Sequence, residues 1–231
     1  MLRKLFMVLV LGCGFVGNAH IAMASLDKET IEYMKKVRAA AEQGDAKAQY
    51  DLGSMYEMDI FEQIDLKQAA IWYRKAAEQG QKNAQGSLAH LYHIGKGVPQ
   101  DYKQALFWYH KAAEQGDSYA QHRLGDIYSQ GRLVQRDLKQ ALLWYQKASE
   151  QGDFRAQYEL GCIYSDDYYG EDTGVPKDYK QGYAWLSASV ANGYSVGITL
   201  RDKSAAKLTA TELSDAQALA IRYFEQYQEK K

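Results

Sequence analysis

The sequence predicts an all-α fold, a right-handed α/α superhelical solenoid of helix-turn-helix repeats with capping helices at both ends. The first indication is a period of 36 residues in glycine and tryptophan, which lengthens to 41 only in the last unit. The recurring residues are Gly44, Gly80, Gly116, Gly152 and Gly193, and Trp72, Trp108, Trp144 and Trp185. The second is that each period divides into two stretches of helical spacing, and the third is that the whole chain has only 2 prolines.

The first half of each period predicts an amphipathic helix, called helix A below. In the second unit Ala84, Leu88, Leu91 and Tyr92 recur at the spacing of one helix face. The equivalent sets are Ala48, Leu52, Met55 and Tyr56; Ala120, Leu124, Ile127 and Tyr128; and Ala156, Leu160, Ile163 and Tyr164. Five residues after the alanine stands Gly53, Ala89, Gly125 or Gly161, so we expect a neighbouring helix to approach closely there.

The second half predicts a second helix, called helix B. Asp101 occupies an N-cap position, and Ala105, Trp108, Tyr109 and Ala112 form an apolar stripe behind it. Asp65, Asp137 and Asp178 hold the same cap position in the other units. The recurrence of the Trp-Tyr pair predicts that both rings fill the core between repeats. The glycine after each helix B fits a left-handed C′ residue and predicts a tight turn into the next helix A.

The remaining segments predict a signal peptide and two caps on one solenoid domain, 25–231. Residues 29–43 align with helix B as an unpaired N-terminal cap. After Gly193 we expect a helix over about 195–207 and a second one opened by a Thr209–Glu212 capping box. The predicted divisions are 1–24 signal peptide, 25–44 N-terminal cap, 45–80, 81–116, 117–152 and 153–193 repeats, and 194–231 C-terminal cap.

The first 24 residues have the layout of a cleavable secretory signal. Arg3 and Lys4 precede an apolar run, and Ala22-Met23-Ala24 offers small residues at a cleavage site. Cleavage near Ala24 predicts a periplasmic or secreted protein without a membrane span. The alternative is a lipoprotein anchored through Cys13, which lies in Val10-Leu11-Gly12-Cys13. Cys162 is the only cysteine after Ala24, so an internal disulfide is excluded in the cleaved chain.

Composition excludes several classes of protein. The 231 residues have a formal net charge of −1, a mean hydropathy of −0.51 and 25% charged residues, which is typical of globular proteins and not of disordered or multi-span membrane chains. Nucleic-acid binding requires clustered excess Lys and Arg, and the chain offers no such excess. We therefore expect no nucleic-acid partner.

The repeat resembles a known family in three consecutive motifs. They read Ala-Gln-x-x-Leu-Gly-x-x-Tyr, then Gly-x-Gly-Val-x-x-Asp-Tyr-x-x-Ala, then Trp-Tyr-x-x-Ala-Ala-x-x-Gly, and the second unit carries Gly95-Lys96-Gly97-Val98. This is similar to the Sel1-like repeat, the bacterial relative of the tetratricopeptide repeat. The resemblance implies an α/α superhelix that binds other proteins, with helix A lining its groove.

Helix A positions opposite the apolar stripe vary from unit to unit, and we expect them to contact a partner. They are Tyr50, Asp51, Ser54; Gly86, Ser87, His90; His122, Arg123, Asp126; and Tyr158, Glu159, Cys162. The best candidates for partner binding, called the helix A row, are Tyr50, Ser54, His90, His122, Arg123, Asp126, Tyr158 and Glu159. An ordinary solvated helix face is the alternative.

Two loops depart from the repeat. Unit four is longer before helix B and carries Asp166, Asp167, Tyr168 and Tyr169, which suit a basic or amphipathic protein partner, although a merely solvated loop is the alternative. In unit one, apolar residues between Met58 and Ile64 replace the Gly-x-Gly turn, and we expect them to pack inward, with exposure of these side chains as the alternative.

Residues with catalytic or metal-binding potential are isolated. Ser204 and Lys207 have the Ser-x-x-Lys spacing of β-lactamase-like enzymes, but Ser-Asp-Asn and Lys-Thr-Gly are missing. His90 and His93 lack further zinc ligands in sequence and are interpreted as surface histidines. We therefore predict no catalytic, cofactor-binding or metal-binding residues and no enzyme activity.

These observations favour a non-enzymatic scaffold or adaptor that binds another protein in the bacterial cell envelope. We expect a monomer that binds through the helix A row and the loop of unit four. The alternative is a periplasmic immunity protein that neutralises a secreted lipase-type effector. A β-lactamase-like hydrolase is the least favoured class.

Overall fold

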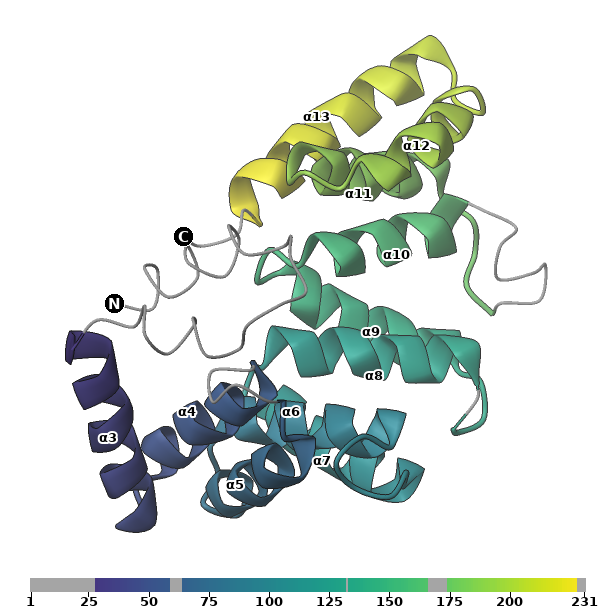
Figure 1. The fold of residues 1–231 in the computed structure, drawn as a ribbon. Helices are drawn as coiled ribbons and strands as arrows, with labels where there is room; N and C mark the ends of the chain where they lie inside the picture. The colour runs from purple at the N-terminus through teal and green to yellow at the C-terminus, as the bar shows by residue number, and fades with distance from the viewer. Residues whose placement is uncertain (1–27, 59–63, 132, 166–173, 228–231) are drawn as a thin grey trace, which may run out of the picture.

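A computed structural model describes residues 28–58, 64–131, 133–165 and 174–227, and eleven α-helices lie within them. The helices stack in chain order from α3 to α11, each packing mainly on its neighbours in sequence, and α12 and α13 both pack on α11 (Figure 1). Their bounds are α3 Lys28–Glu42, α4 Ala46–Glu57, α5 Leu66–Glu78, α6 Lys82–Ile94, α7 Tyr102–Glu114, α8 Ser118–Gln130, α9 Leu138–Ser149, α10 Phe154–Ser165, α11 Tyr179–Ala191, α12 Ile198–Ala205 and α13 Ala210–Gln226. The predicted all-α solenoid is confirmed, with α4, α6, α8 and α10 as helices A and α5, α7, α9 and α11 as helices B.

Aspartate caps hold the start of every helix B. The Asp101 carboxylate accepts hydrogen bonds from the backbone N–H groups of Lys103 and Gln104 at 2.9 and 3.0 Å, and Asp65, Asp137 and Asp178 do the same in α5, α9 and α11. The Asp101 backbone N–H donates to the Tyr92 carbonyl at 3.1 Å. Unit four keeps this contact, from Asp178 to Tyr164 at 2.9 Å, so its longer loop does not disturb the junction of the two helices.

Glycine is required at two kinds of position. Gly116 has φ +81°, and the other four glycines that follow a helix B, or α3, are also in the left-handed region, as predicted. Gly53 serves close packing instead, because a Cβ there would lie 2.7 Å from the ring of Tyr73. Gly125 and Gly161 meet Tyr145 and Leu186 in the same manner, which confirms the predicted close approach.

The aromatic pairs divide between core and edge. Tyr73, Tyr109 and Tyr145 are essentially fully buried, as predicted, and so are Trp144 and Trp185 at 7% and 5% exposure. Trp72 and Trp108 pack against the core but are only half-buried, so they lie at its edge in units one and two and not fully inside it as expected. The two side chains point in different directions from helix B: the tyrosine faces the small residue of helix A, and the tryptophan lies to one side of it. The Trp72 ring instead contacts Lys75, whose Nζ lies 3.9 Å from the ring centroid.

A ladder of buried glutamine side chains ties the units together. Gln85 on α6 donates through Nε2 to the Ala77 carbonyl at the end of α5, at 3.1 Å. Its Oε1 accepts from Gln115 Nε2, just after α7, at 2.7 Å. The same contacts join Gln49 to Ala41 and Gln79, and Gln121 to Ala113 and Gln151. Each amide therefore connects three consecutive helices.

The C-terminal cap ends this ladder. In unit four, Gln157 Oε1 accepts from Asn192 at 2.9 Å, and its Nε2 donates to the Tyr227 carbonyl after α13 at 3.2 Å. The Trp185 ring stacks on Tyr223 with centroids 4.0 Å apart. The predicted capping box at Thr209 and Glu212 is present. The helix expected over 195–207 is shorter, because a 3₁₀ turn at Ser195–Gly197 precedes α12.

The irregular loop of unit one differs from expectation at its ends. Met58 and Ile64 are 45% and 56% exposed, so inward packing was wrong at these two positions. Residues 59–63 lie outside the described part of the chain, as do the proposed signal peptide 1–24 and Cys13.

Replacing Gln85 by Met tests the ladder. The substitution keeps the volume but removes both hydrogen bonds of the buried amide, to the Ala77 carbonyl and from Gln115 Nε2, and we expect a loss of about 2 kcal/mol in the free energy of unfolding. Urea denaturation followed by circular dichroism measures it. The control is Gln115→Ala, at the exposed end of the same contact, which should cost less than half as much. Equal costs for both variants would contradict the assigned role of the buried amide.

Two glycine-to-alanine variants on helices A test the close approach. Gly53→Ala gains helix propensity but drives a methyl group into the Tyr73 ring, and we expect a net loss of about 1–2 kcal/mol. Gly86→Ala places its methyl group 3.5 Å from the Asp117 carboxylate, an ordinary contact, and should stabilise α6 by up to about 1 kcal/mol. Thermal melts of both variants are the measurement, and a stabilised Gly53→Ala protein would refute the packing constraint.

Candidate protein-binding surface

The helix A row lies on α4, α6, α8 and α10, but it is less exposed than a free helix face. Seven of its eight members are half-buried, and His122 is buried at 8% exposure. Gly86 and Cys162, expected on the same face, are also buried. The expectation of an outward face was wrong at Gly86 and His122, because neighbouring segments cover them; the Asp117 side chain, for example, lies against Gly86.

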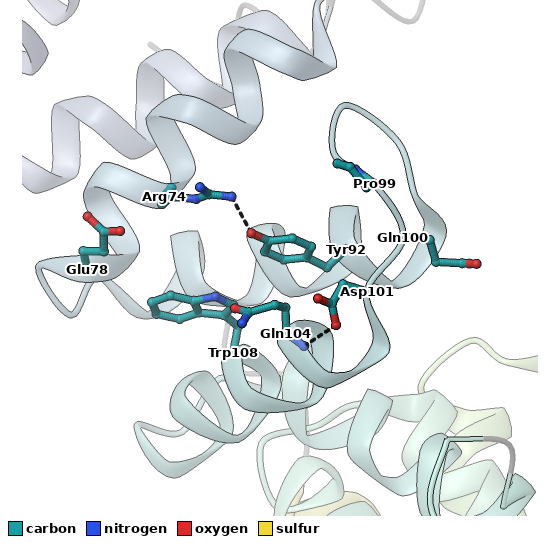
Figure 2. A pocket seen from close by; sticks show the side chains of 8 residues that line it. All are labelled: Arg74, Glu78, Tyr92, Pro99, Gln100, Asp101, Gln104 and Trp108. Atoms are coloured by element: carbon teal, nitrogen blue, oxygen red, sulfur yellow. Dashed lines mark hydrogen bonds between the residues drawn. The ribbon is translucent and has the colours of Figure 1, made fainter.

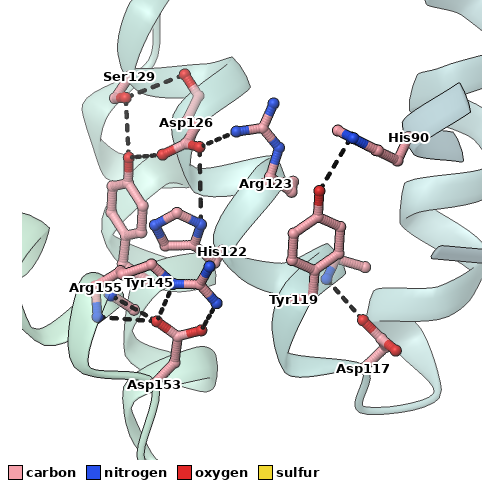
Figure 3. A network of polar contacts seen from close by, with 12 residues as sticks. His90, Asp117, Tyr119, His122, Arg123, Asp126, Ser129, Tyr145, Asp153 and Arg155 are labelled. Carbon is pink, nitrogen blue, oxygen red and sulfur yellow. Dashed lines mark hydrogen bonds and ion pairs between the residues drawn. The ribbon is translucent and has the colours of Figure 1, made fainter. Parts of the chain in front are cut away.

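A network of polar contacts occupies the middle of the row (Figure 3). Asp126 accepts hydrogen bonds from Arg123 Nη1 at 2.8 Å and from the Tyr145 hydroxyl at 3.0 Å. Ser129 Oγ lies 3.1 Å from the same hydroxyl. These contacts join α8 to α9 and hold the Asp126 carboxylate in place. Arg123 takes part in them through Nη1.

His90 belongs to the same surface through a contact between helices A. The Tyr119 hydroxyl on α8 lies 3.0 Å from His90 Nδ1 on α6. Burial lowers the pKa of His90, and the nearby Arg123 lowers it further. The neutral ring and the Tyr119 hydroxyl therefore share one hydrogen bond through Nδ1. His90 and His93, interpreted as surface histidines, are both half-buried. Tyr119 packs on the first ring, and Tyr102 and Tyr109 pack on the second.

His122 is the most buried ionisable member of the row. Burial lowers its pKa, while Asp126 and Asp153 act in the opposite direction and Arg155 and Arg123 act with burial. Arg155 Nη2 is itself paired with Asp153 Oδ2 at 2.9 Å. His122 is therefore neutral near pH 7, and its ring packs on Tyr145 at 5.8 Å between centroids.

Unit four contributes an aromatic group to the row. The Tyr158 ring meets Tyr194 edge to face at 5.3 Å, and Tyr194 also contacts Phe154 at 5.3 Å. Tyr158 and Glu159 remain half-buried and accessible in part. The other predicted site residues of this unit, Asp166, Asp167, Tyr168 and Tyr169, lie outside the described residues, so their role stays a prediction.

A hollow that the sequence analysis did not predict lies between α5 and α7 (Figure 2). Its volume is about 500 Å³, and its walls include Arg74, Glu78, Tyr92 and Trp108. Arg74 donates to the Tyr92 hydroxyl across it. Because the sequence pattern placed the Trp108 ring in the core, it did not predict a hollow beside this ring.

The outer side of helix B carries three exposed apolar side chains in register. Ile71, Phe107 and Leu143 precede the tryptophans of units one to three and are 47%, 50% and 47% exposed. Their repeat position was visible in the sequence. Only the structure shows that they point away from the core.

The candidate catalytic and metal-binding residues find structural roles or remain isolated. Ser204 is buried, and its hydroxyl donates to the Leu200 carbonyl at 2.9 Å, so it points into its own helix and not toward a substrate. Among residues 28–58, 64–131, 133–165 and 174–227, no group of three His, Cys, Asp or Glu side chains could hold a metal ion. Over the same ranges, no helix combines the length and apolarity needed to cross a bilayer.

Stacked helix pairs with an invariant core and a varied polar row define an α-solenoid of the protein-binding class. A family model described as the Sel1 repeat matches residues 46–81, 83–117, 118–153 and 154–194. The chain belongs to the Sel1 repeat family. Proteins of this family are interaction scaffolds, and the repeat is generally a non-catalytic fold.

Solved structures with similar folds include two bacterial relatives above 25% identity. A Sel1 repeat protein from Oxalobacter formigenes is 27% identical, with 94% of this chain and 92% of that chain covered and a TM-score of 0.69. A protective antigen of uropathogenic Escherichia coli with an SLR fold is 35% identical, with 84% and 48% covered and a TM-score of 0.54. This chain therefore spans about half the length of the antigen.

A weaker likeness links the chain to an immunity protein from Pseudomonas aeruginosa. The identity is 19%, with 85% of this chain and 89% of that chain covered and a TM-score of 0.38, which is too low to bear on function. A search of curated proteins finds no match to the chain.

The histidines whose pKa is lowered in the folded protein predict a loss of stability on acidification. Because the folded-state pKa of His122 lies below its ordinary value, the unfolded chain binds more protons near pH 6, and the free energy of unfolding falls as the pH drops below about 6.5. His90, His93 and His110 are shifted in the same direction and add to the effect. Urea midpoints should therefore decrease as the pH is lowered from 7.5 to 5.5. The pKa of Asp117 is raised, so protonation of this carboxyl has the opposite effect on stability, and it takes place at lower pH than that of the histidines.

The variant His122→Gln isolates one part of this dependence. It should flatten the slope by at most about 1.4 kcal/mol per pH unit, the limit for a single proton. A slope identical to that of the parent would show that His122 titrates normally and is not buried in solution.

Proposed function

We propose that this protein is a non-enzymatic scaffold of the bacterial cell envelope that binds another protein through the helix A row. The observation that carries the proposal is the contrast between the two faces of helix A. The buried face repeats the same alanine, glutamine and leucine in every unit, and the row carries a different set of tyrosine, histidine, arginine and acidic side chains in each. Core packing requires the repeated residues of the buried face. It does not require the residues of the helix A row, so these can differ between units to suit a partner.

The residue types of the row support recognition of a protein. Tyr50 and Tyr158 are half-buried, and their rings are held by Tyr73 and Tyr194, so they can bury area on a partner with little loss of side-chain entropy. Arg123 is fixed by Asp126 and keeps donors available. Preorganised side chains of this kind reduce the entropic cost of binding.

The proposed location follows from the N-terminal 24 residues, which have the signal layout, with a lipid anchor at Cys13 as the alternative. A basic or amphipathic partner is the expectation for the acidic loop of unit four. The alternative function, an inhibitor of a lipase-type effector, uses the same surface and stays a prediction.

Site-specific photocrosslinking in the native envelope tests the proposal. The full chain is expressed in its own bacterium with benzoylphenylalanine in place of Tyr50 or Tyr158, and we expect both positions to yield an adduct with the same protein. The matched control replaces Phe107, an exposed aromatic residue on helix B, which should not yield that adduct.

Two further results complete the design. Replacing Arg123 by Gln in the Tyr158 photocrosslinking variant should reduce the adduct, because a preorganised contact is lost. An adduct formed from Phe107 and not from Tyr50 or Tyr158 would move the binding surface to the outer side of helix B and overturn the proposal.

A further inference from the structure

A lysine covers the helix B tryptophan in units one and three. Lys75 Nζ lies 3.9 Å from the ring centroid of Trp72, and Lys147 Nζ lies 4.4 Å from that of Trp144. Each lysine follows its tryptophan by three residues, so the two side chains are neighbours on one helix surface. A cation above an indole ring is attracted by the negative charge of its face. The chain itself therefore shows which kind of group these rings accept.

Unit two departs from this pattern. Lys111 holds the same repeat position, but it lies over the ring of Phe107, at 5.8 Å from the centroid. Phe107 replaces the isoleucine and leucine of units one and three, so it offers the lysine a second aromatic ring. Its ring meets that of Trp108 edge to face, with centroids 4.9 Å apart. Trp108 is left half-buried, at the border of the hollow between α5 and α7.

The equivalent junction between α7 and α9 is filled by a side chain of the protein. His110 packs edge to face on Trp144 with centroids 5.7 Å apart, and Trp144 is 7% exposed. Arg74 holds the position of His110 one unit earlier, but its guanidinium donates to the Tyr92 hydroxyl. A hollow of about 500 Å³ remains beside Trp108. This junction therefore has room for a side chain of another molecule.

The charges around the hollow favour a cation. Glu78 and Asp101 contribute carboxylates to its walls, against one guanidinium from Arg74. Figure 2 shows that guanidinium directed at Tyr92 and away from Glu78. Glu78 is exposed, ends α5 at the negative pole of the helix dipole, and forms no hydrogen bond or ion pair with the described residues. A cationic group in the hollow gains this carboxylate, whereas an anion would be repelled by it.

We propose that the hollow binds a lysine or arginine side chain of a partner protein, with the cationic group on the Trp108 ring and beside Glu78. Tyr92, Pro99 and Gln104 supply neutral walls along which the methylene groups of such a side chain lie. The site goes beyond the proposed function, because the hollow is lined by residues outside the helix A row.

Titration with blocked peptides, followed by NMR, tests the site. The indole N–H signals of the 4 tryptophans are recorded on the ¹⁵N-labelled protein at constant ionic strength, and that of Trp108 is assigned by its absence from Trp108→Phe. We expect at least one of acetyl-Gly-Lys-Gly-amide and acetyl-Gly-Arg-Gly-amide to shift the Trp108 signal saturably. The Trp72 signal, whose ring Lys75 already covers, should move less.

Two further peptides test the charge of the bound group. Norleucine in place of lysine keeps the methylene chain without its charge, and glutamate reverses the charge. Neither peptide should shift the Trp108 signal at concentrations at which the cationic peptide saturates it. The proposal fails if either of these peptides binds as well as the cationic ones, or if no cationic peptide shifts the signal.

Variants of exposed glutamates separate binding from folding. Glu78→Gln removes the unpaired carboxylate and should raise the dissociation constant of the cationic peptide about three-fold, a typical effect of one exposed charge contact. Glu114→Gln, at the same repeat position in unit two, is the matched control and should leave the constant nearly unchanged. Equal constants for the two variants would contradict the role of Glu78 and overturn the proposal.

Phe107→Leu tests why the ring of Trp108 is uncovered. Leucine stands at this position in unit three, where Lys147 covers Trp144. The variant should therefore let Lys111 turn to the Trp108 ring, where its charge opposes that of the incoming side chain. We expect weaker binding of the cationic peptide and a urea midpoint close to that of the parent, since Phe107 is 50% exposed. Binding as tight as that of the parent, or tighter, would count against a cation site on this ring.

Discussion

The buried glutamine of each helix A is the contact on which the stacking of this protein depends. Its amide donates to the last turn of the preceding helix B and accepts from the residue that ends its own helix B, as Gln85 does with Ala77 and Gln115. An amide in an apolar interior is tolerated only when both ends are paired. Each unit is therefore placed relative to the unit before it, and the row on the other side of helix A inherits a fixed geometry.

Much of this architecture was predictable because it follows from local rules. The period, the aspartate caps and the left-handed glycines depend on a few residues whose backbone requirements are read from one unit alone. The role of the glutamine was not predictable, although its recurrence was visible, because it depends on carbonyl groups of two other helices.

The candidate site was predictable only as a set of positions. Helical spacing gives the direction in which a side chain points from the axis of its helix. It correctly placed Leu88 on the buried face and His90 on the opposite, more exposed face. It could not show that the next helix A covers Gly86, or that Trp108 borders a hollow, because coverage depends on the tilt of neighbouring helices. The two histidines of unit two were visible in the sequence, but the packing of His90 on Tyr119 and of His93 on the rings of Tyr102 and Tyr109 required the structure.

Positions that depart from the repeat are informative because the rest of each unit is so similar. In a solenoid each unit contacts only its neighbours, so a residue that departs from the repeat changes only the junction in which it lies. The glutamine ladder holds α6, α7 and α8 in place whatever side chains the helix A row carries between them. The repeated contacts therefore explain how the helices are held, and the positions that vary between units are where we expect binding specificity to lie.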